Sequence, residues 1–434
     1  MPEDSLPELK ILIAAALKQS PQMILSEISI SQNEAVRYFS TSQRLPQVAV
    51  NASYAWNNIS ADIAEPAGGF KPGDPRINRD KSSGPYYGVS LSQPIFTWYA
   101  ITNQVKLSDI AIKIAEKNYA EAYRSLASAL RSQYLSLIFQ KIARRNQRYN
   151  LSQTERLLAL DEARLKSGAM APAELIGPRT GYASARLAMA RTDDIYARSK
   201  TQLARLAGVA LIDEESIPLE APKWSADPAA AAALVARLQR DGAEATLQGQ
   251  INALRIRDSE LTYKIARTRL YPKFSLSASA AQYNSQNVTS TSVSQASAFS
   301  TSYGISGSWT LFDGFAARGA KLNALALKRT YEQVQKNLAA QVSDQVKAAA
   351  QAIEFAAQSL ELVETARAGV LANLDRIKDE FERGSLTEDA VTSATSQLYA
   401  QDAAVVAVRI DLLGRWVELV SLVGNDPVLN QLPA

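Results

Sequence analysis

Cysteine and histidine are both missing from the 434 residues of this chain. Without cysteine there are no disulfide bonds, thiolate metal ligands or thiol nucleophiles, and without histidine there are no imidazole bases or imidazole metal ligands. We therefore expect no metal, no cofactor and no catalytic residue, and we interpret the protein as not an enzyme. The alternative is an active site built on carboxylates, for which the sequence contains no recognisable constellation of acids.

Long hydrophobic runs are missing too. No stretch of 18 uncharged apolar residues occurs, so we expect no helix that spans a membrane. The first residues, MPEDSLPELK, lack the basic and apolar regions of a signal peptide. We therefore expect a signal peptide to be absent from the sequence shown, which then belongs either to a cytosolic protein or to a mature form with a new initiator methionine.

Aromatic residues make up only 7% of the chain, and the net charge is only +4. The hydrophobic content of 47% consists largely of alanine and leucine, which is typical of long helices packed closely through small side chains. The densest basic stretch, KIARRNQRYN at 141–150, has no aromatic platform or nucleic-acid motif beside it. We interpret it as a solvated helix face and expect no nucleic-acid partner.

Comparison of the chain with itself reveals an internal repeat. YYGVSLSQPIF at 86–96 aligns with SYGISGSWTLF at 302–312, an offset of 216 residues, and the same offset places Gly168 on Gly384 without a gap. Such a long ungapped match predicts a tandem duplication. We predict a first repeat over 1–208, a connector over 209–232, a second repeat over 233–424 and a tail over 425–434.

Four segments alternate apolar and small polar residues with a period of two, namely 47–57, 86–96, 273–283 and 302–312. Each has about ten residues, the length that a tilted strand needs to cross hydrocarbon, and Lys273 is their one charged residue. This pattern is typical of a transmembrane β-barrel with a watery lumen. The alternative is a half-buried sheet of a soluble protein. We expect 58–85 and 284–300 to be exposed loops.

Aromatic residues gather at both ends of these predicted strands, as anchoring at the two membrane interfaces requires. The membrane-interface candidates are Tyr54, Trp56, Tyr87, Phe96, Trp98, Phe274, Trp309 and Phe312. Four strands cannot close a barrel, and open sheet edges are prohibitively costly in lipid. Two copies of the chain would give eight strands and three would give twelve, and the residue pattern alone does not choose between them.

Very long helices follow the second strand of each repeat. No glycine or proline occurs between Pro94 and Gly168, and Gly369 is the one interruption between Gly319 and Gly384. Apolar residues recur at coiled-coil spacings of 7, 4, 3 and 4 in the second repeat, at Val363, Val370, Leu374, Ile377 and Phe381. Helices alone would also fit a soluble coiled-coil scaffold, but the strands argue against it.

Five short motifs give the chain a family resemblance. They are RLKSGAMAPAEL at 164–175, LARLAG at 203–208, ARTRLYPKFSL at 266–276, LFDGF at 311–315 and EFERGSLTEDAVTSATSQL at 380–398. With these motifs in repeat order along nearly the whole chain, the sequence resembles the TolC-like outer membrane efflux protein family. Two features depart from the family pattern: QPIFTWY at 93–99 replaces a glycine-rich turn, and QRDGAEATL at 239–247 lacks the Arg-Pro-Asp of many drug-efflux members.

The resemblance implies an α+β membrane protein that forms a homotrimer. Its twelve-stranded transmembrane β-barrel, with four strands per chain, would lie in the bacterial outer membrane, in contact with lipid. The barrel would continue as a long α-helical coiled-coil barrel in the periplasm. The implied function is the exit duct of a tripartite efflux or type I secretion system, with a periplasmic adaptor protein and an inner-membrane pump or ABC transporter as partners. The alternatives are a passive porin and a soluble periplasmic coiled-coil scaffold.

The two glycine turns are the best candidates for a functional site, because glycine permits the positive φ of a tight helix reversal. In the family these reversals form the periplasmic tip. The resemblance therefore implies gate candidates at Lys166, Glu174, Glu382, Glu388 and Asp389. It also implies adaptor contacts at Arg164, Gly168, Phe381, Arg383 and Gly384. Where known members have an Asp six residues after the second glycine, this chain has Ala390. The alternative is that these charges are merely solvated.

Overall fold

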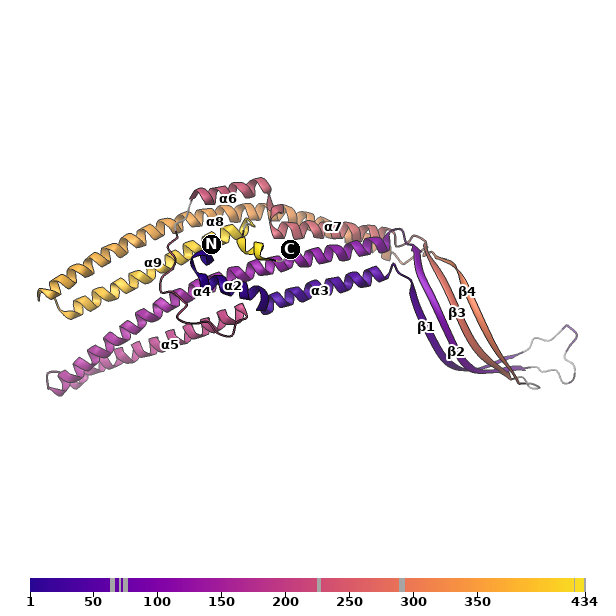
Figure 1. The fold of residues 1–434 in the computed structure, drawn as a ribbon, viewed down its shortest axis with the longest axis horizontal. Helices are drawn as coiled ribbons and strands as arrows, with labels where there is room; N and C mark the ends of the chain where they lie inside the picture. The colour runs from indigo at the N-terminus through magenta and orange to yellow at the C-terminus, as the bar shows by residue number, and fades with distance from the viewer. Residues whose placement is uncertain are drawn as a thin grey trace. The chain divides into compact units, whose positions relative to one another are not determined.

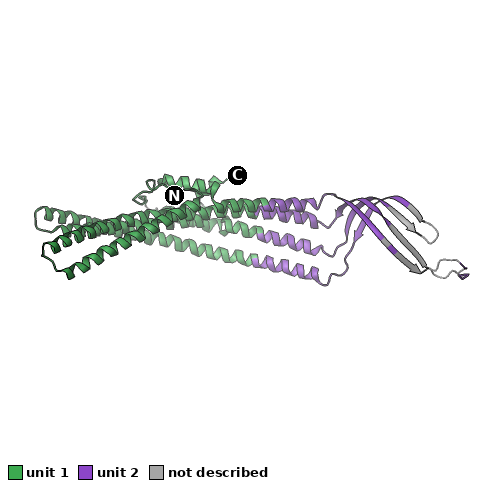
Figure 2. Ribbon diagram, turned by 90° about the horizontal axis from the view of Figure 1, so that it is seen from below, with its two compact units in different colours: residues 1–31, 114–254, 331–434 green, residues 32–113, 255–330 purple. Residues whose placement is uncertain are grey.

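The fold is that of a computed structural model, which describes residues 1–62, 67–69, 72, 77–224, 228–288, 293–424 and 426–432. The chain forms two compact units (Figure 2). The helical unit consists of residues 1–31, 114–254 and 331–434, and the sheet unit consists of residues 32–113 and 255–330.

Helices make up most of the described chain (Figure 1). The α-helices are α1 Pro2–Ser5, α2 Pro7–Gln19, α3 Pro21–Ser42, α4 Ala100–Lys166, α5 Ile176–Ala207, α6 Pro228–Asp241, α7 Leu247–Arg267, α8 Ala316–Glu382 and α9 Glu388–Leu422. Three 3₁₀ turns, η1 Pro172–Leu175, η2 Ala243–Ala245 and η3 Pro427–Gln431, complete the set. Among the described residues, no helix is apolar over a length that would cross a membrane.

The two longest helices match each other. Helices α4 and α8 have 67 residues each, and both their first and their last residues are 216 positions apart. A helix of this length extends roughly 100 Å. Each is a single continuous helix, because no proline interrupts either one and Gly369 is tolerated inside α8.

One antiparallel sheet has the strand order β1-β2-β3-β4 (Figure 1). The strands are β1 Gln47–Asp62, β2 Ile77–Phe96, β3 Lys273–Val288 and β4 Val293–Ser308. The prediction that 58–85 and 284–300 are loops is wrong for 58–62 and 77–85, which is half of the first range, and for 284–288 and 293–300, which is most of the second, because these segments pair with one another as strands. The sequence pattern missed them since they lack apolar residues at alternate positions.

Strand β4 ends at Ser308, so the prediction that it reaches residue 312 is wrong. The last pair of β3 and β4 joins Lys273 to Ser308. Pro272 precedes Lys273 and has no N–H to donate, so the ladder stops there. Trp309 instead donates its indole N–H to the carbonyl of Leu270, at 3.1 Å. Trp309 and Phe312 therefore lie beyond the strand.

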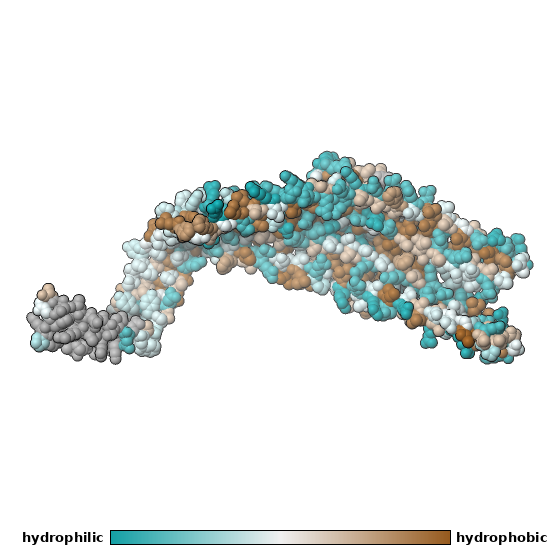
Figure 3. All heavy atoms as spheres, turned by 180° about the vertical axis from the view of Figure 1, so that it is seen from behind, coloured by the Kyte–Doolittle hydropathy of each residue, from teal (hydrophilic) through white to brown (hydrophobic). Residues whose placement is uncertain are grey.

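The sheet has a polar and an apolar face, as predicted. Serine hydroxyls bond across β3 and β4 on the polar face, at 2.9 Å between Ser275 and Ser306 and 2.8 Å between Ser279 and Ser302. The opposite face carries large apolar side chains that are exposed in the single chain, and Tyr303 is 88% exposed. The described part of the sheet is mostly pale in Figure 3, without the strongly hydrophilic colour that covers much of the helices.

The core of the helical unit lies along α4. Leu126, Leu130, Tyr134 and Leu137 are fully buried there, in one cluster with residues of α2, α5 and the segment 209–224. Burial raises the pKa of Tyr134 to about 12, with a smaller contribution from Glu8. The phenol therefore stays protonated and donates to the carbonyl of Ser216, at 3.3 Å. A second cluster joins α6, α8 and α9.

The basic stretch of α4 holds the segment 209–224 in place. Lys141 donates to the carbonyls of Glu214 and Ile217, at 2.7 and 2.6 Å. Arg144 pairs with Asp193 of α5 and, at 2.5 Å, with Glu214. The prediction that this stretch is a solvated face is therefore wrong for Lys141 and Arg144.

A buried ion cluster fixes both ends of the chain to α4. Arg131 is 1% exposed and bonds to Glu3 and Asp426, which are 8% and 2% exposed. The Nε···Oε2 distance to Glu3 is 3.0 Å, and the two distances to Asp426 are 2.6 and 2.9 Å. Burial alone would lower the pKa of Arg131, but the hydrogen bonds and charges of Asp426 and Glu3 raise it above its ordinary value.

Replacing Arg131 by methionine should therefore leave two buried carboxylates without a cation. Removing one partner of a buried pair costs about 3–5 kcal/mol of stability. We expect that loss in guanidinium unfolding of the detergent-solubilised protein. The control is Arg198→Met, which breaks an exposed pair with Asp194 on α5 and should cost less than about 1 kcal/mol. Equal losses in the two variants would contradict the assigned role of Arg131.

Candidate functional site

The two reversals of the helical unit have the same geometry. Gly168 has φ of 77° and Gly384 has φ of 76°. The next N–H in each turn bonds to the carbonyl five residues back, from Ala169 to Arg164 and from Ser385 to Glu380, at 2.9 Å in both. Each glycine N–H also bonds to the carbonyl three residues before it. This pair of bonds is the Schellman motif, whose left-handed residue is favourable for glycine.

The gate candidates all lie at these turns and are exposed. Lys166 and Glu382 end α4 and α8, and Glu388 and Asp389 begin α9. Glu174 accepts a hydrogen bond from the backbone N–H of Ala171, at 3.0 Å, and thereby caps η1. The adaptor-contact candidates Arg164, Phe381 and Arg383 are exposed beside the same turns, and Arg164 pairs with Asp161 at 3.3 Å.

Glu388 is the one gate candidate that the structure joins to a different long helix. It forms an ion pair with Arg156 of α4, and the other amino group of Arg156 lies 3.3 Å from the hydroxyl of Thr392 on α9. The Glu388 side chain is 63% exposed and that of Arg156 is 32% exposed. Arg156 was not among the sequence candidates, because it lies ten residues before the end of α4 and in no motif.

A polar seam continues between α4, α8 and α9 away from the turns. Asn146 donates to the carbonyl of Tyr399 at 2.8 Å. Asp402 of α9 lies 2.6 Å from Arg367 of α8 and 3.8 Å from Arg145 of α4. The guanidinium of Arg145 also stacks on the ring of Tyr399, 5.1 Å from its centre. Sequence reasoning found none of these contacts, since the partners are far apart in the chain.

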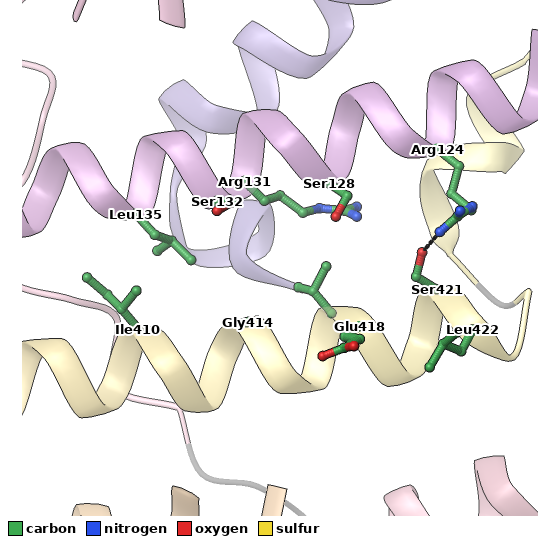
Figure 4. A pocket seen from close by; sticks show the side chains of 11 residues that line it. Arg124, Ser128, Arg131, Ser132, Leu135, Ile410, Gly414, Glu418, Ser421 and Leu422 are labelled. Carbon is green, nitrogen blue, oxygen red and sulfur yellow. Dashed lines mark hydrogen bonds between the residues drawn. The ribbon is translucent and has the colours of Figure 1, made fainter. Parts of the chain in front are cut away.

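A pocket of 420 Å³ lies between α4 and α9 (Figure 4). Arg124 crosses it to the hydroxyl of Ser421, while Arg131 is held by the buried ion cluster. Gly414 leaves room on the α9 side. Glu418 is the one acid among its lining residues, so the pocket offers no pair of carboxylates for acid–base work.

The aromatic candidates form two groups on the sheet unit. At one end, Phe96 pairs with Phe274, and Trp98 donates its indole N–H to the carbonyl of Pro272 at 2.7 Å. The other group contains Tyr87, which lies nine residues before Phe96 on β2, together with Tyr54 and Trp56 of β1. The ring centres of Tyr54 and Trp56 are 4.6 Å apart. Nine residues span roughly 30 Å of strand, or about 23 Å of height at the usual barrel tilt of about 40°. That height fits the apolar band of an outer-membrane barrel, about 25 Å tall.

Comparison with known proteins decides the family. The sequence pattern of the family described as "Outer membrane efflux protein" matches residues 12–209 and 250–425. The chain belongs to the outer membrane efflux protein family. The resemblance inferred from the five motifs is thereby confirmed, and the two matched ranges follow the order of the repeats. The family consists of channel proteins.

Solved structures of efflux-family channels share the fold of this chain. The outer membrane protein VceC of Vibrio cholerae is 15% identical with a TM-score of 0.67, and the match covers 96% of each chain. The CmeC outer membrane channel of Campylobacter jejuni is 14% identical with a TM-score of 0.70, over 96% of this chain and 85% of CmeC. The pyoverdine export outer membrane protein OpmQ of Pseudomonas aeruginosa is 23% identical over 276 residues, which are 63% of this chain and 56% of OpmQ.

Alanine at either turn glycine of this efflux-family protein should be destabilising through the backbone alone. A side chain at Gly168 or Gly384 would touch nothing within 4 Å, so the cost is that of the left-handed conformation, about 1–2 kcal/mol. The control is Gly177→Ala, inside α5 with equally open space, where alanine should be neutral or stabilising. Thermal unfolding of the three variants measures the difference. A stable Gly384→Ala variant would contradict the requirement for glycine.

Proposed function

We propose that this protein is the outer-membrane exit duct of a tripartite efflux or type I secretion system. The observation that carries the proposal is the sheet: an apolar face on which no described side chain is charged, two aromatic groups about 23 Å apart in height at the usual barrel tilt, and a serine-rich opposite face. A face of this kind is stable against lipid but not against water. Helices of 67 residues follow the strands and supply a wall long enough for the periplasm.

The proposed assembly is a homotrimer with a twelve-stranded barrel. In a single chain β1 and β4 each have one partner, so both edges of the sheet are open. Open edges in hydrocarbon leave N–H and C=O groups unpaired, at a cost of several kcal/mol each. Copies joined from β4 of one to β1 of the next remove every edge. The family resemblance favours three copies over two.

The proposed partners are a periplasmic adaptor protein at the turns of Gly168 and Gly384 and an inner-membrane pump or ABC transporter. The exposed side chains of Arg164, Phe381 and Arg383 support the adaptor site, since the turns offer both charged and apolar contacts. We also propose that 1–208 and 233–424 are duplicated halves joined by the connector 209–232, because the ends of α4 and α8 keep the offset of 216 residues.

Membrane fractionation and planar-bilayer recording test this function. The protein, expressed with a signal peptide, should be found in the outer-membrane fraction, cross-link to three times the 47.1 kDa chain and conduct ions. Export of substrate by cells should require the adaptor and the pump as well as this chain. A soluble, non-conducting monomer would overturn the proposal. Conductance with inward diffusion and no requirement for a pump would favour the passive porin instead.

The gate is proposed to lie where Glu388 meets Arg156. In this proposal the tip opens when one helical hairpin moves away from the other, and this ion pair joins α9 to α4 beside the turns. Lys166, Glu174, Glu382 and Asp389 complete the ring of charges at the turns. An inward ring of charges sets both selectivity and closure energy in a symmetric channel.

Arg156→Gln should shift the channel toward the open state. An exposed ion pair contributes about 0.2–1 kcal/mol. Loss of three such pairs should therefore raise the open-to-closed ratio by a factor of between about three and about a hundred. The control is Arg376→Gln, which breaks a 2.6 Å pair with Glu380 within α8 alone and should leave the ratio unchanged. Open probability in single-channel recordings is the readout. If the two variants open equally often, the Arg156–Glu388 pair does not close the gate.

A further inference from the structure

Lys273 is the one charged residue on the part of the sheet whose side chains are described. The strand stretches whose side chains are described, 47–56, 83–96, 273–283 and 296–308, contain no other Lys, Arg, Asp or Glu. A charge on the apolar face would oppose insertion into lipid. The effect of Lys273 therefore depends on which face of the sheet carries it.

The register places Lys273 on the polar face. Successive side chains of a strand alternate between faces, so Lys273 shares a face with Ser275, whose hydroxyl bonds to Ser306 at 2.9 Å. Lys273 pairs with Ser308 in the last row of β3 and β4, at the end of the sheet nearest the helices. It is exposed, and among the described residues no carboxylate lies within ion-pair distance of it. The nearby Arg269 is neutralised by Asp313 at 3.3 Å.

We propose that Lys273 forms an electrostatic filter at the base of the barrel and that the barrel favours anionic solutes. This proposal rests on the proposed function, because closure of the barrel turns the polar face toward the lumen. Each copy then contributes one ammonium to a ring at the base of the barrel. Above that ring the wall is hydroxyl-lined and uncharged over the described stretches, so no second charge there opposes it.

The physical effect of the ring depends on salt. A ring of like charges raises the local concentration of counter-ions and repels co-ions. At 0.1 M salt the Debye length is about 10 Å, comparable with the distance from a barrel wall to its axis, and at 1 M it is about 3 Å. The filter therefore acts on the whole lumen at low salt and only near the wall at high salt.

Reversal potentials in a potassium chloride gradient test the proposal. In Lys273→Gln the chloride-to-potassium permeability ratio should fall about threefold at low salt, by Coulomb interaction with three screened charges. Lys273→Glu should lower it further. Lys273→Arg keeps the charge and should match the wild type. Ser275→Glu adds an opposite charge two residues along the same face and should lower the ratio with Lys273 in place.

The outcomes separate this proposal from the proposed function. A wild-type protein that does not conduct overturns the proposed function. A conducting channel whose permeability ratio is the same in Lys273→Gln and Lys273→Arg overturns the filter alone. So does a difference between them that stays unchanged from 0.1 M to 1 M salt, because a lumenal charge must be screened. Unchanged single-channel conductance at 1 M in all variants verifies that each one folds and assembles.

Discussion

Main-chain hydrogen bonding in hydrocarbon is the constraint on which the rest of this structure depends. A strand inside a membrane has no water for its N–H and C=O groups, so each must bond to another strand. The sheet β1-β2-β3-β4 meets that need internally and leaves two open edges. The proposed assembly closes the ring with copies of the chain, and the proposed trimer, lumen and exit path all follow from that closure. Alternation of small polar and apolar residues is what lets one sheet face water and lipid at once.

The two longest helices have the same length and end in the same way. Two helices of equal length, α4 and α8, end in turns of equal geometry at Gly168 and Gly384. Equal helices are required if the turns are to meet at one level as a tip. The buried cluster of Arg131 with Glu3 and Asp426 then holds both chain ends against α4, so that the terminal segments add to the helical core. Arg131 has no counterpart 216 residues later, where the chain has Lys347.

Sequence reasoning predicted what local patterns encode and missed what distant residues make together. The strand parts 47–57, 86–96, 273–283 and 302–308, the long helices, the two glycine turns and the family were predicted correctly, because period, breakers and spacing are local. The outer halves of the strands were missed, since Ser- and Asn-rich segments show no apolar period. The end of β4 at Ser308 is imposed by Pro272, which precedes β3 and cannot continue the ladder. The pairs Arg156–Glu388 and Arg145–Asp402 join positions more than 200 residues apart, so no spacing rule reveals them.

The two junctions between strand and helix have the same backbone conformation, although they are built from different residues. Gly314 and Phe315 have φ of 63° and 66°, and at the corresponding positions of the first repeat Trp98 and Tyr99 have φ of 54° and 63°. A bulky residue in this region is strained, so Trp98 must be held by its surroundings. Its indole bonds to Pro272 at 2.7 Å and its ring packs edge-on against Phe96 and Tyr271. The second junction instead relies on the freedom of Gly314 and on Asp313, which caps α8. The bend is therefore required by the architecture, while the residues that produce it are interchangeable.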